Sequence, residues 1–174
     1  MDVSAHAGSL ETERLLLRPP RLSDAQDLLR FFGDREAMRY THVFPDLRAC
    51  RRHIAGHACQ RRQRGYGPWT LIEKASGAIV GLGGLYDDPF DPGWGIEVGY
   101  HFLPAVWGRG LASELVAFCI AYARERLRVQ AINAFAHRDN VASRRVLTKA
   151  GFAEVRFVTQ MNRYLYVCTL TDTP

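Results

Sequence analysis

The order of apolar and polar positions along the chain predicts strands and the way in which some of them pair. We expect strands over residues 13–19, 66–74, 78–87, 94–103, 129–136, 152–160 and 163–170. The three residues "ASG" join the second of these strands to the third, which is typical of a hairpin. The last two strands are expected to form another hairpin around Met161 and Asn162.

Apolar residues that recur every three or four positions predict the helices. We expect helices over 22–34, 48–64, 111–128 and 140–151, and a shorter helical piece over 34–40. In the first helix Ser23 is a good N-cap, Gln26 completes a capping box, and Gly33 can end the helix. The last helix should begin at Asp139 or Asn140 and end at Gly151.

The mixed order of these elements predicts an α/β (α+β) fold with one central sheet flanked by helices. The 174 residues are enough for one domain, which we place at 12–174 after a flexible N-terminus at 1–11. Hydrophobic residues make up 47% of the chain and charged residues 24%, so an ordinary globular protein is expected rather than a disordered one.

Several classes of protein are not indicated by the sequence. The first ten residues lack the features of a signal peptide, and no apolar run approaches the ~18 residues of a membrane span. The four cysteines lie far apart, so no zinc site and no disulfide framework is expected. We therefore predict a cytoplasmic protein with reduced cysteines and no bound metal.

The formal net charge of +5 is unevenly distributed along the chain. The segment from Arg48 to Arg64 holds six arginines and two histidines. Leu47, Cys50 and Ile54 can form its apolar stripe, which leaves the arginines exposed. This helix is either a docking face for an acidic or phosphate-bearing partner or an ordinary solvated face.

The stretch "VWGRGLASEL", at 106–115, places two glycines between a strand and a helix. The N–H groups of a helix N-terminus suit an anion, and Gly108 and Gly110 would let it approach the backbone closely. Arg109 would add a positive charge, so a pyrophosphate is a natural ligand. The alternative is a tight turn without a ligand. A Rossmann motif is excluded because Ser113 occupies the position of its third glycine, and no Gly-Lys-Ser/Thr of a P-loop follows.

The ordered set of motifs resembles the GNAT-superfamily acyltransferases, in the branch of the ribosomal-protein N-terminal (alanine) acetyltransferases. In "WGRGLA", Trp107 takes the Gln/Arg position of the coenzyme A signature, Gly110 its glycine and Ala112 its last position. The stretch "DNVASRRVLTKAGF", at 139–152, matches a second signature. The resemblance extends from about Thr12 to Leu170.

The resemblance implies the GNAT acyl-CoA N-acyltransferase fold, with a mixed, strongly twisted central sheet. Acetyl-CoA would lie where strands 94–103 and 129–136 splay apart, and a homodimer is common in such folds. The implied coenzyme-binding residues are Phe102, Leu103, Trp107, Gly108, Arg109, Gly110, Leu111, Ala112, Asn140, Ser143 and Arg145. Arg144 and Lys149 are further candidates for phosphate contacts.

Acetyl transfer to an amine requires a base for the amine and a donor for the leaving thiolate. Glu97 is the candidate base, unless it is a charge on a solvent-exposed strand face, and His101 could share or replace it. Ser143 is the donor that the resemblance implies. Many members of the superfamily use a tyrosine instead, and no tyrosine lies between Tyr122 and Tyr164. Cys119 should be buried, which argues against a covalent route.

The acceptor is expected to be a primary amine attacked in a ternary complex with acetyl-CoA. The resemblance favours a protein N-terminal amine, and the basic helix would suit an acidic peptide or a ribosome-bound chain. The loop with Asp87, Asp88 and Asp91 would instead suit a polyamine or an aminoglycoside. A third alternative is a non-catalytic module that docks RNA, ribosome or protein through the basic helix.

Overall fold

One mixed sheet of eight strands, in the order β1-β2-β3-β4-β5-β6-β8-β7, runs through residues 9–170, which the computed structural model describes. The strands are β1 (Leu10–Glu11), β2 (Leu15–Arg18), β3 (Trp69–Glu73), β4 (Ile79–Tyr86), β5 (Glu97–Phe102), β6 (Ala131–His137), β7 (Ala153–Val158) and β8 (Arg163–Thr169). Neighbouring strands are antiparallel except β5 and β6, which are parallel.

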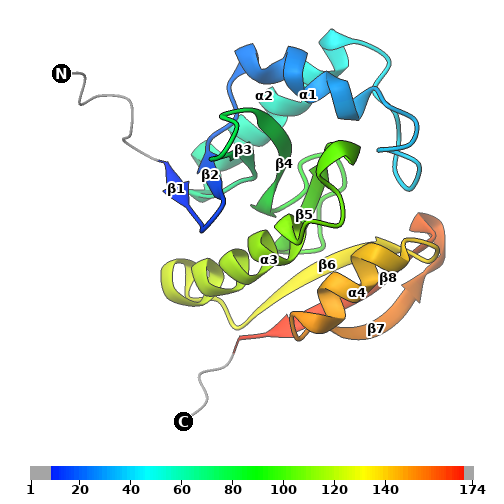
Figure 1. The fold of residues 1–174 in the computed structure, drawn as a ribbon. Coiled ribbons are helices and arrows are strands. Elements are labelled where there is room, and N and C mark those ends of the chain that lie inside the picture. The colour runs from blue at the N-terminus through cyan, green and yellow to red at the C-terminus, as the bar shows by residue number, and fades with distance from the viewer. Residues whose placement is uncertain (1–8, 171–174) are drawn as a thin grey trace.

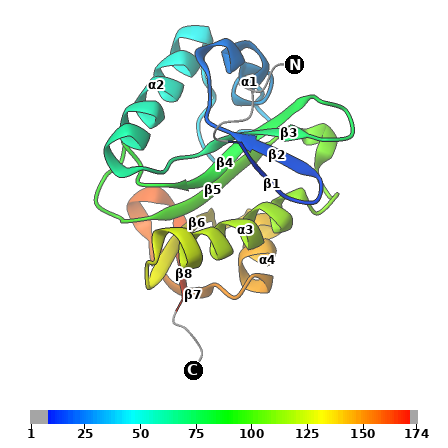
Figure 2. The same ribbon diagram turned by 90° about the vertical axis from the view of Figure 1, so that its left-hand side faces the viewer.

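Four α-helices cover the two faces of the sheet: α1 (Ala25–Phe32), α2 (Leu47–Arg64), α3 (Leu111–Tyr122) and α4 (Val141–Lys149). Helices α1 and α2 lie side by side over the N-terminal strands, while α3 and α4 lie on the other side of the molecule, with α4 against β6 and β7 (Figures 1 and 2). Short helical turns at Leu22–Asp24, Pro104–Val106, Ala123–Leu127 and Thr159–Met161 complete the fold.

The only parallel pair of the described sheet separates almost as soon as it forms. Strands β5 and β6 share the single register pair Glu97↔Asn133, whereas β4 and β5 pair over six positions. Leu103 N–H donates to the Val80 carbonyl, so strict antiparallel alternation turns the backbone groups of Tyr100 and Phe102 away from β4 and toward β6. The backbone edge of β5 is therefore unpaired beyond the bridge, as the expected splay requires.

Side chains alternate across β5 and belong to two different hydrophobic cores. Val98 and Phe102 join the larger core under α3. His101 faces the opposite side, where its ring packs on Phe32 of α1. Glu97, four residues before His101, lies on the same face of β5, because successive side chains of a strand point to opposite faces.

The structure confirms the strands, the two hairpins and the four long helices, and it corrects three local predictions. Residues 34–40 form successive turns rather than a helix. Leu10 and Glu11, which we placed in the flexible N-terminus, pair with β2; residues 1–8 lie outside the described part. Ser23 does not cap the first helix, because a 3-10 turn precedes α1.

Asp24 takes the capping position that we assigned to Ser23. Its carboxylate accepts two hydrogen bonds from the Arg18 guanidinium, both at 2.7 Å, one from Arg21 N–H at 2.9 Å and one from the Thr70 hydroxyl at 2.8 Å. Burial alone would raise the pKa of Asp24, but these donors outweigh it and the pKa lies below its usual value. One side chain thus ties β2, the start of α1 and β3 together.

Asp24→Asn should therefore destabilise the protein by about 3 kcal/mol, since it breaks the ion pair of a buried carboxylate and leaves the partly buried Arg18 charge without a partner. Urea unfolding measures the change, and Asp27→Asn on the exposed side of α1 is the control, expected to stay within about 0.5 kcal/mol. The folded-state pKa lies below the unfolded one, so this contribution is present above pH ~4 and is lost as the pH falls through the folded-state pKa. A variant as stable as the control would contradict the role of Asp24.

Candidate active site

The glycines before α3 are required by the backbone and also leave space in front of the helix. Gly108 and Gly110 have φ values of +73° and +79°, which other residues rarely adopt. A Cβ at Gly108 would have no neighbour within 4 Å. Gly110 is the N-cap of α3 but offers no side chain, and within residues 9–170 no group accepts a hydrogen bond from the N–H of Leu111 or Ala112. The helix N-terminus thus fits an anion such as a phosphate.

Arg109 is bound by a neighbouring strand. Its guanidinium forms an ion pair with Glu73 at the end of β3. The Arg109 carbonyl accepts a 2.7 Å hydrogen bond from Arg14, and Arg14 also pairs with Glu114 of α3 at 2.6 Å. These contacts fix the glycine loop from outside, so Arg109 contributes to its shape, and a phosphate contact would compete with Glu73.

Two of the backbone groups that we assigned to the coenzyme are already used inside the protein. The Trp107 indole N–H donates to the Phe102 carbonyl at 2.9 Å, and Leu103 N–H donates to Val80 at 2.8 Å. The groups that remain on the open edge of β5 are those of Tyr100 and the N–H of Phe102. Any backbone contact with a pantetheine arm is therefore expected there rather than at Leu103 N–H.

Ser143 has a partner that the sequence analysis missed. The Tyr100 hydroxyl lies 2.9 Å from Ser143 Oγ, which links β5 to the first turn of α4. Asn140 is the N-cap of α4, where its side chain accepts a 3.1 Å hydrogen bond from Ser143 N–H. Burial raises the pKa of Tyr100 to about 12, with the hydrogen bond to Ser143 opposing this shift, so the hydroxyl stays protonated at neutral pH. Our argument from the absence of a tyrosine after Tyr122 overlooked this residue on the preceding strand.

Glu97 is a buried carboxyl group with a strongly altered affinity for protons. Its exposed fraction is 7%, and burial together with the charges of Asp88, Asp91 and Asp87 raises its pKa to about 8, although Arg163 acts in the opposite direction. It is therefore not a charge on a solvent-exposed strand face. A carboxyl group with this pKa can accept a proton near neutral pH and is a far stronger base than an ordinary glutamate.

His101 lies in surroundings that make it a poor base. Its ring packs against Phe32 at 5.4 Å, and burial together with the charges of His53, Arg163 and His42 lowers its pKa to about 3. His53 and His57 on α2 have pKa values lowered to about 3 and about 4, mainly by burial. These histidines stay neutral at physiological pH and form, with Phe44 and Phe90, a cluster of rings beside β5.

The positive residues of α4 divide into one that is engaged and two that are exposed. Arg144 donates to the Tyr166 hydroxyl at 3.0 Å and pairs with Glu154 at 3.2 Å, so it holds β7 and β8 to the helix. Arg145 and Lys149 are exposed, and they line a depression of about 490 Å³ between α4 and the strands β7 and β8. These two residues are free to reach phosphates.

Two further observations limit the chemistry of the site. Cys119 is fully buried in the core, which raises the pKa of its thiol and keeps it unreactive. Within residues 9–170, no group of three or more His, Cys, Asp or Glu side chains is arranged to hold a metal ion.

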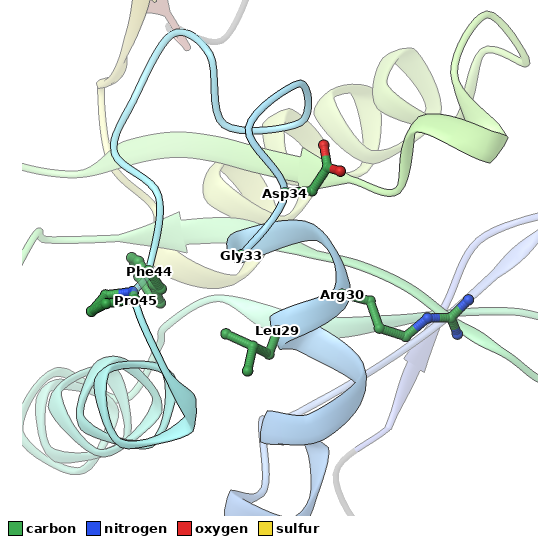
Figure 3. A pocket seen from close by; sticks show the side chains of 6 residues that line it. All are labelled: Leu29, Arg30, Gly33, Asp34, Phe44 and Pro45. Atoms are coloured by element: carbon green, nitrogen blue, oxygen red, sulfur yellow. The ribbon is translucent and has the colours of Figure 1, made fainter.

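The depression shown in Figure 3 is not lined by Glu97, Tyr100, Ser143 or the glycine loop. It has a volume of about 390 Å³ and is lined by Leu29, Arg30, Gly33, Asp34, Phe44 and Pro45. It forms where the chain returns past the C-terminal end of α1, and none of our candidate coenzyme or catalytic residues contributes to it. We assign it no part in the site.

Three features together define an acyl-CoA-dependent acyltransferase fold. The parallel strands β5 and β6 separate and leave a gap after their single register pair, a glycine loop precedes α3, and a capped α4 lies beside the gap. Residues 14–153 match the family model described as "Acetyltransferase (GNAT) domain". The chain therefore belongs to the GNAT acetyltransferase family and is an acetyl-CoA-dependent N-acetyltransferase. It has the GNAT fold, as predicted.

Similarity to individual proteins, in sequence and in structure, is consistent with this assignment. The uncharacterized N-acetyltransferase YoaA of Bacillus subtilis is 28% identical over 161 residues, covering 90% of this chain and 88% of YoaA. The structure of the ribosomal-protein-S5-alanine acetyltransferase of Vibrio fischeri aligns with a TM-score of 0.75 and 18% identity over 95% of this chain and 99% of that one. The acetyltransferase yncA of Salmonella typhimurium, solved with acetyl-CoA, aligns with a TM-score of 0.67 and 20% identity over 92% and 96% of the two chains.

Proposed function

We propose that this enzyme moves an acetyl group from acetyl-CoA directly to a primary amine and that Glu97 accepts the proton of that amine. The observation that supports this most strongly is the buried Glu97 carboxyl, raised to a pKa of about 8 on the strand that borders the gap. An ammonium of the lysine type has a pKa near 10. The raised pKa of the Glu97 carboxyl lies closer to the pKa of the ammonium, so less free energy is needed to transfer the proton. A carboxylate becomes an effective base in this way.

Tyr100 and Ser143 are proposed to stabilise the negative charge that develops on the departing sulfur. Because the pKa of Tyr100 is about 12, its hydroxyl keeps its proton and acts as a hydrogen-bond donor rather than as an acid. One hydroxyl of the pair can donate to the other, which leaves a hydrogen for the sulfur. Asn140 holds Ser143 at the start of α4 and thereby fixes the position of the pair.

The residues around the glycine loop are proposed to bind the coenzyme. The free N–H groups of Leu111 and Ala112 would bind its pyrophosphate, and Arg145 would contribute a charge from α4. The N–H of Phe102 would bind the pantetheine arm. When bound, the coenzyme supplies the activated acetyl group, and the protein positions it between β5 and α4.

A protein N-terminal amine is our first candidate for the acceptor, supported by the fold that the chain shares with the ribosomal-protein-S5-alanine acetyltransferase. Arg48, Arg51, Arg52 and Arg62 are exposed along α2, which would suit a ribosome-bound or acidic partner.

Cytoplasmic localisation is also part of the proposal, since the four cysteines are free thiols. A homodimer stays a prediction. No helix among the described residues is long and apolar enough to cross a membrane.

The direct test is release of the free thiol from acetyl-CoA in the presence of a panel of amines, with mass spectrometry of the acceptor. We expect thiol release to depend on the amine and to match the amount of acetylated product. The panel should contain peptides that begin with alanine, simple alkyl amines and an aminoglycoside. Coenzyme A binding without turnover of any amine would instead identify a non-catalytic docking module.

A further inference from the structure

The loop between β4 and β5 places negative charges beside the buried Glu97. Asp87 is partly neutralised, because Arg64 at the end of α2 pairs with it at 3.2 Å. Asp88 accepts a 2.8 Å hydrogen bond from Phe90 N–H, which shapes the loop but leaves its charge uncompensated. Within residues 9–170, neither Asp88 nor Asp91 forms an ion pair with a cation.

Glu97 gives independent evidence that these charges face a ligand site. Glu97 is 7% exposed, and its carboxyl group, whose oxygens are not fully enclosed, has no hydrogen bond and no ion pair with any described residue. Buried polar groups normally have partners, so a buried carboxyl without one suits a ligand. Glu97 pairs across the sheet with Tyr86, the residue that directly precedes Asp87 and Asp88, so the loop begins beside it. The side chains of Tyr86 on β4 and Arg163 on β8 also lie close enough to Glu97 to interact with its charge.

We propose that the acceptor carries a second positive charge beside the reacting amine and that Asp88 and Asp91 bind this second cation. The proposal rests on the proposed function and names its substrate class. An acceptor with a single amine next to Glu97 would leave the charges of the two aspartates without a counter-ion. A dication places one positive charge at Glu97 and the other at Asp88 and Asp91, in a partly desolvated site. The same chemistry is found in a diamine and in a polypeptide whose N-terminal residue is followed by lysine or arginine.

The aspartates should also be coupled to the base. Asp88, Asp91 and Asp87 raise the pKa of Glu97, while Arg163 lowers it. Removing the charges of Asp88 and Asp91 should therefore lower the pKa of Glu97 and move the acidic limb of the pH profile to lower pH. Replacement by asparagine is suitable because its side-chain oxygen can still accept the Phe90 N–H bond.

The experiment compares kcat/KM for putrescine with kcat/KM for butylamine, and for an Ala-Lys peptide with an Ala-norleucine peptide. We expect the wild type to prefer putrescine over butylamine, or the Ala-Lys peptide over the Ala-norleucine peptide, by tenfold or more. This is the order of magnitude of one charge contact. In the double variant Asp88→Asn/Asp91→Asn this preference should fall to about onefold, and butylamine turnover should persist with its acidic limb at lower pH. Asp27→Asn, which removes a distant exposed charge, is the matched control and should keep the preference.

The two pairs of substrates distinguish a small diamine from a basic polypeptide terminus as the natural source of the second cation. Equal turnover of both members in both pairs would overturn the proposal while leaving the proposed function intact. A preference that survives in the double variant would overturn the role of Asp88 and Asp91. Failure to acetylate any of the four amines would overturn the proposed function itself, and the present inference with it.

Discussion

Glu97→Gln is expected to lower kcat for acetyl transfer by about 10³-fold, within the range that one positioned general base contributes. Glutamine has nearly the shape of glutamate but cannot accept the amine proton. The buried site next to Asp88 should accommodate the neutral side chain without loss of stability, since burial disfavours the charged form of Glu97. The loss should therefore appear in the chemical step rather than in folding.

Steady-state kinetics with saturating acetyl-CoA measures this change, and calorimetric titration with coenzyme A measures binding. The Kd for coenzyme A should stay within about twofold, because Glu97 lies on the face of β5 away from Tyr100 and the glycine loop. Glu36→Gln on the exposed segment after α1 is the control and should leave both quantities unchanged. A full loss of coenzyme binding in the Glu97 variant would mean that the residue has a structural role.

Tyr100→Phe is expected to lower kcat by about 10²-fold, the lower end of the effect of removing one preorganised donor to a developing negative charge. The substitution removes only the hydroxyl that lies 2.9 Å from Ser143 Oγ. The interaction is strongest when charge has developed on the sulfur, so KM for acetyl-CoA should change little. Ser143→Ala should have a similar effect, and the double variant should lose little more than either single variant, because the two hydroxyls act as one unit.

A series of acyl donors tests the chemical assignment of this pair. Thioesters whose thiol is more acidic need less stabilisation when they leave, so the two variants should lose less activity with them than with acetyl-CoA. Tyr164→Phe is the matched control, since Tyr164 packs against Phe157 and its hydroxyl forms no hydrogen bond with a described residue. Equal losses with all leaving groups would assign Tyr100 and Ser143 to coenzyme positioning alone.

Local sequence signals were sufficient for most of the fold. Periodicity located α2, α3 and α4 because each of them packs one apolar side on a sheet, and Asn140 was one of two candidate caps for α4. The glycines at 108 and 110 were recognisable because a left-handed backbone and an open helix N-terminus both require glycine. These features depend on residues close together in the chain.

The features that the sequence did not reveal depend on contacts between distant segments. Asp24 rather than Ser23 fixes the start of the first helix: its carboxylate accepts from Arg21 N–H and is held by Arg18 and Thr70 of two neighbouring strands. Tyr100 and Ser143 are 43 positions apart and meet only because α4 packs beside β5. The alternation of β5 could have suggested this contact, since it places Tyr100 on the opposite face from Glu97.

The burial of individual titratable groups was also not predictable from local patterns. His101 and Glu97 share one face of a single strand, and their surroundings shift both toward the neutral form, which weakens the histidine and strengthens the glutamate as a base. Arg109, a candidate for a phosphate contact, pairs with Glu73 on β3, a contact that the sequence analysis did not predict. Such outcomes follow from packing between elements, which the sequence alone does not specify.

The pH dependence of kcat/KM for butylamine, in the wild type and in Glu97→Gln, tests the central claim most directly. An alkyl amine titrates near pH 10, so an ionisation at lower pH belongs to the enzyme. We predict that the wild-type rate rises with pH through an acidic limb near pH 8, where free Glu97 loses its proton, and that this limb is absent in the variant. An acidic limb that persists unchanged in Glu97→Gln would contradict the assignment of Glu97 as the base.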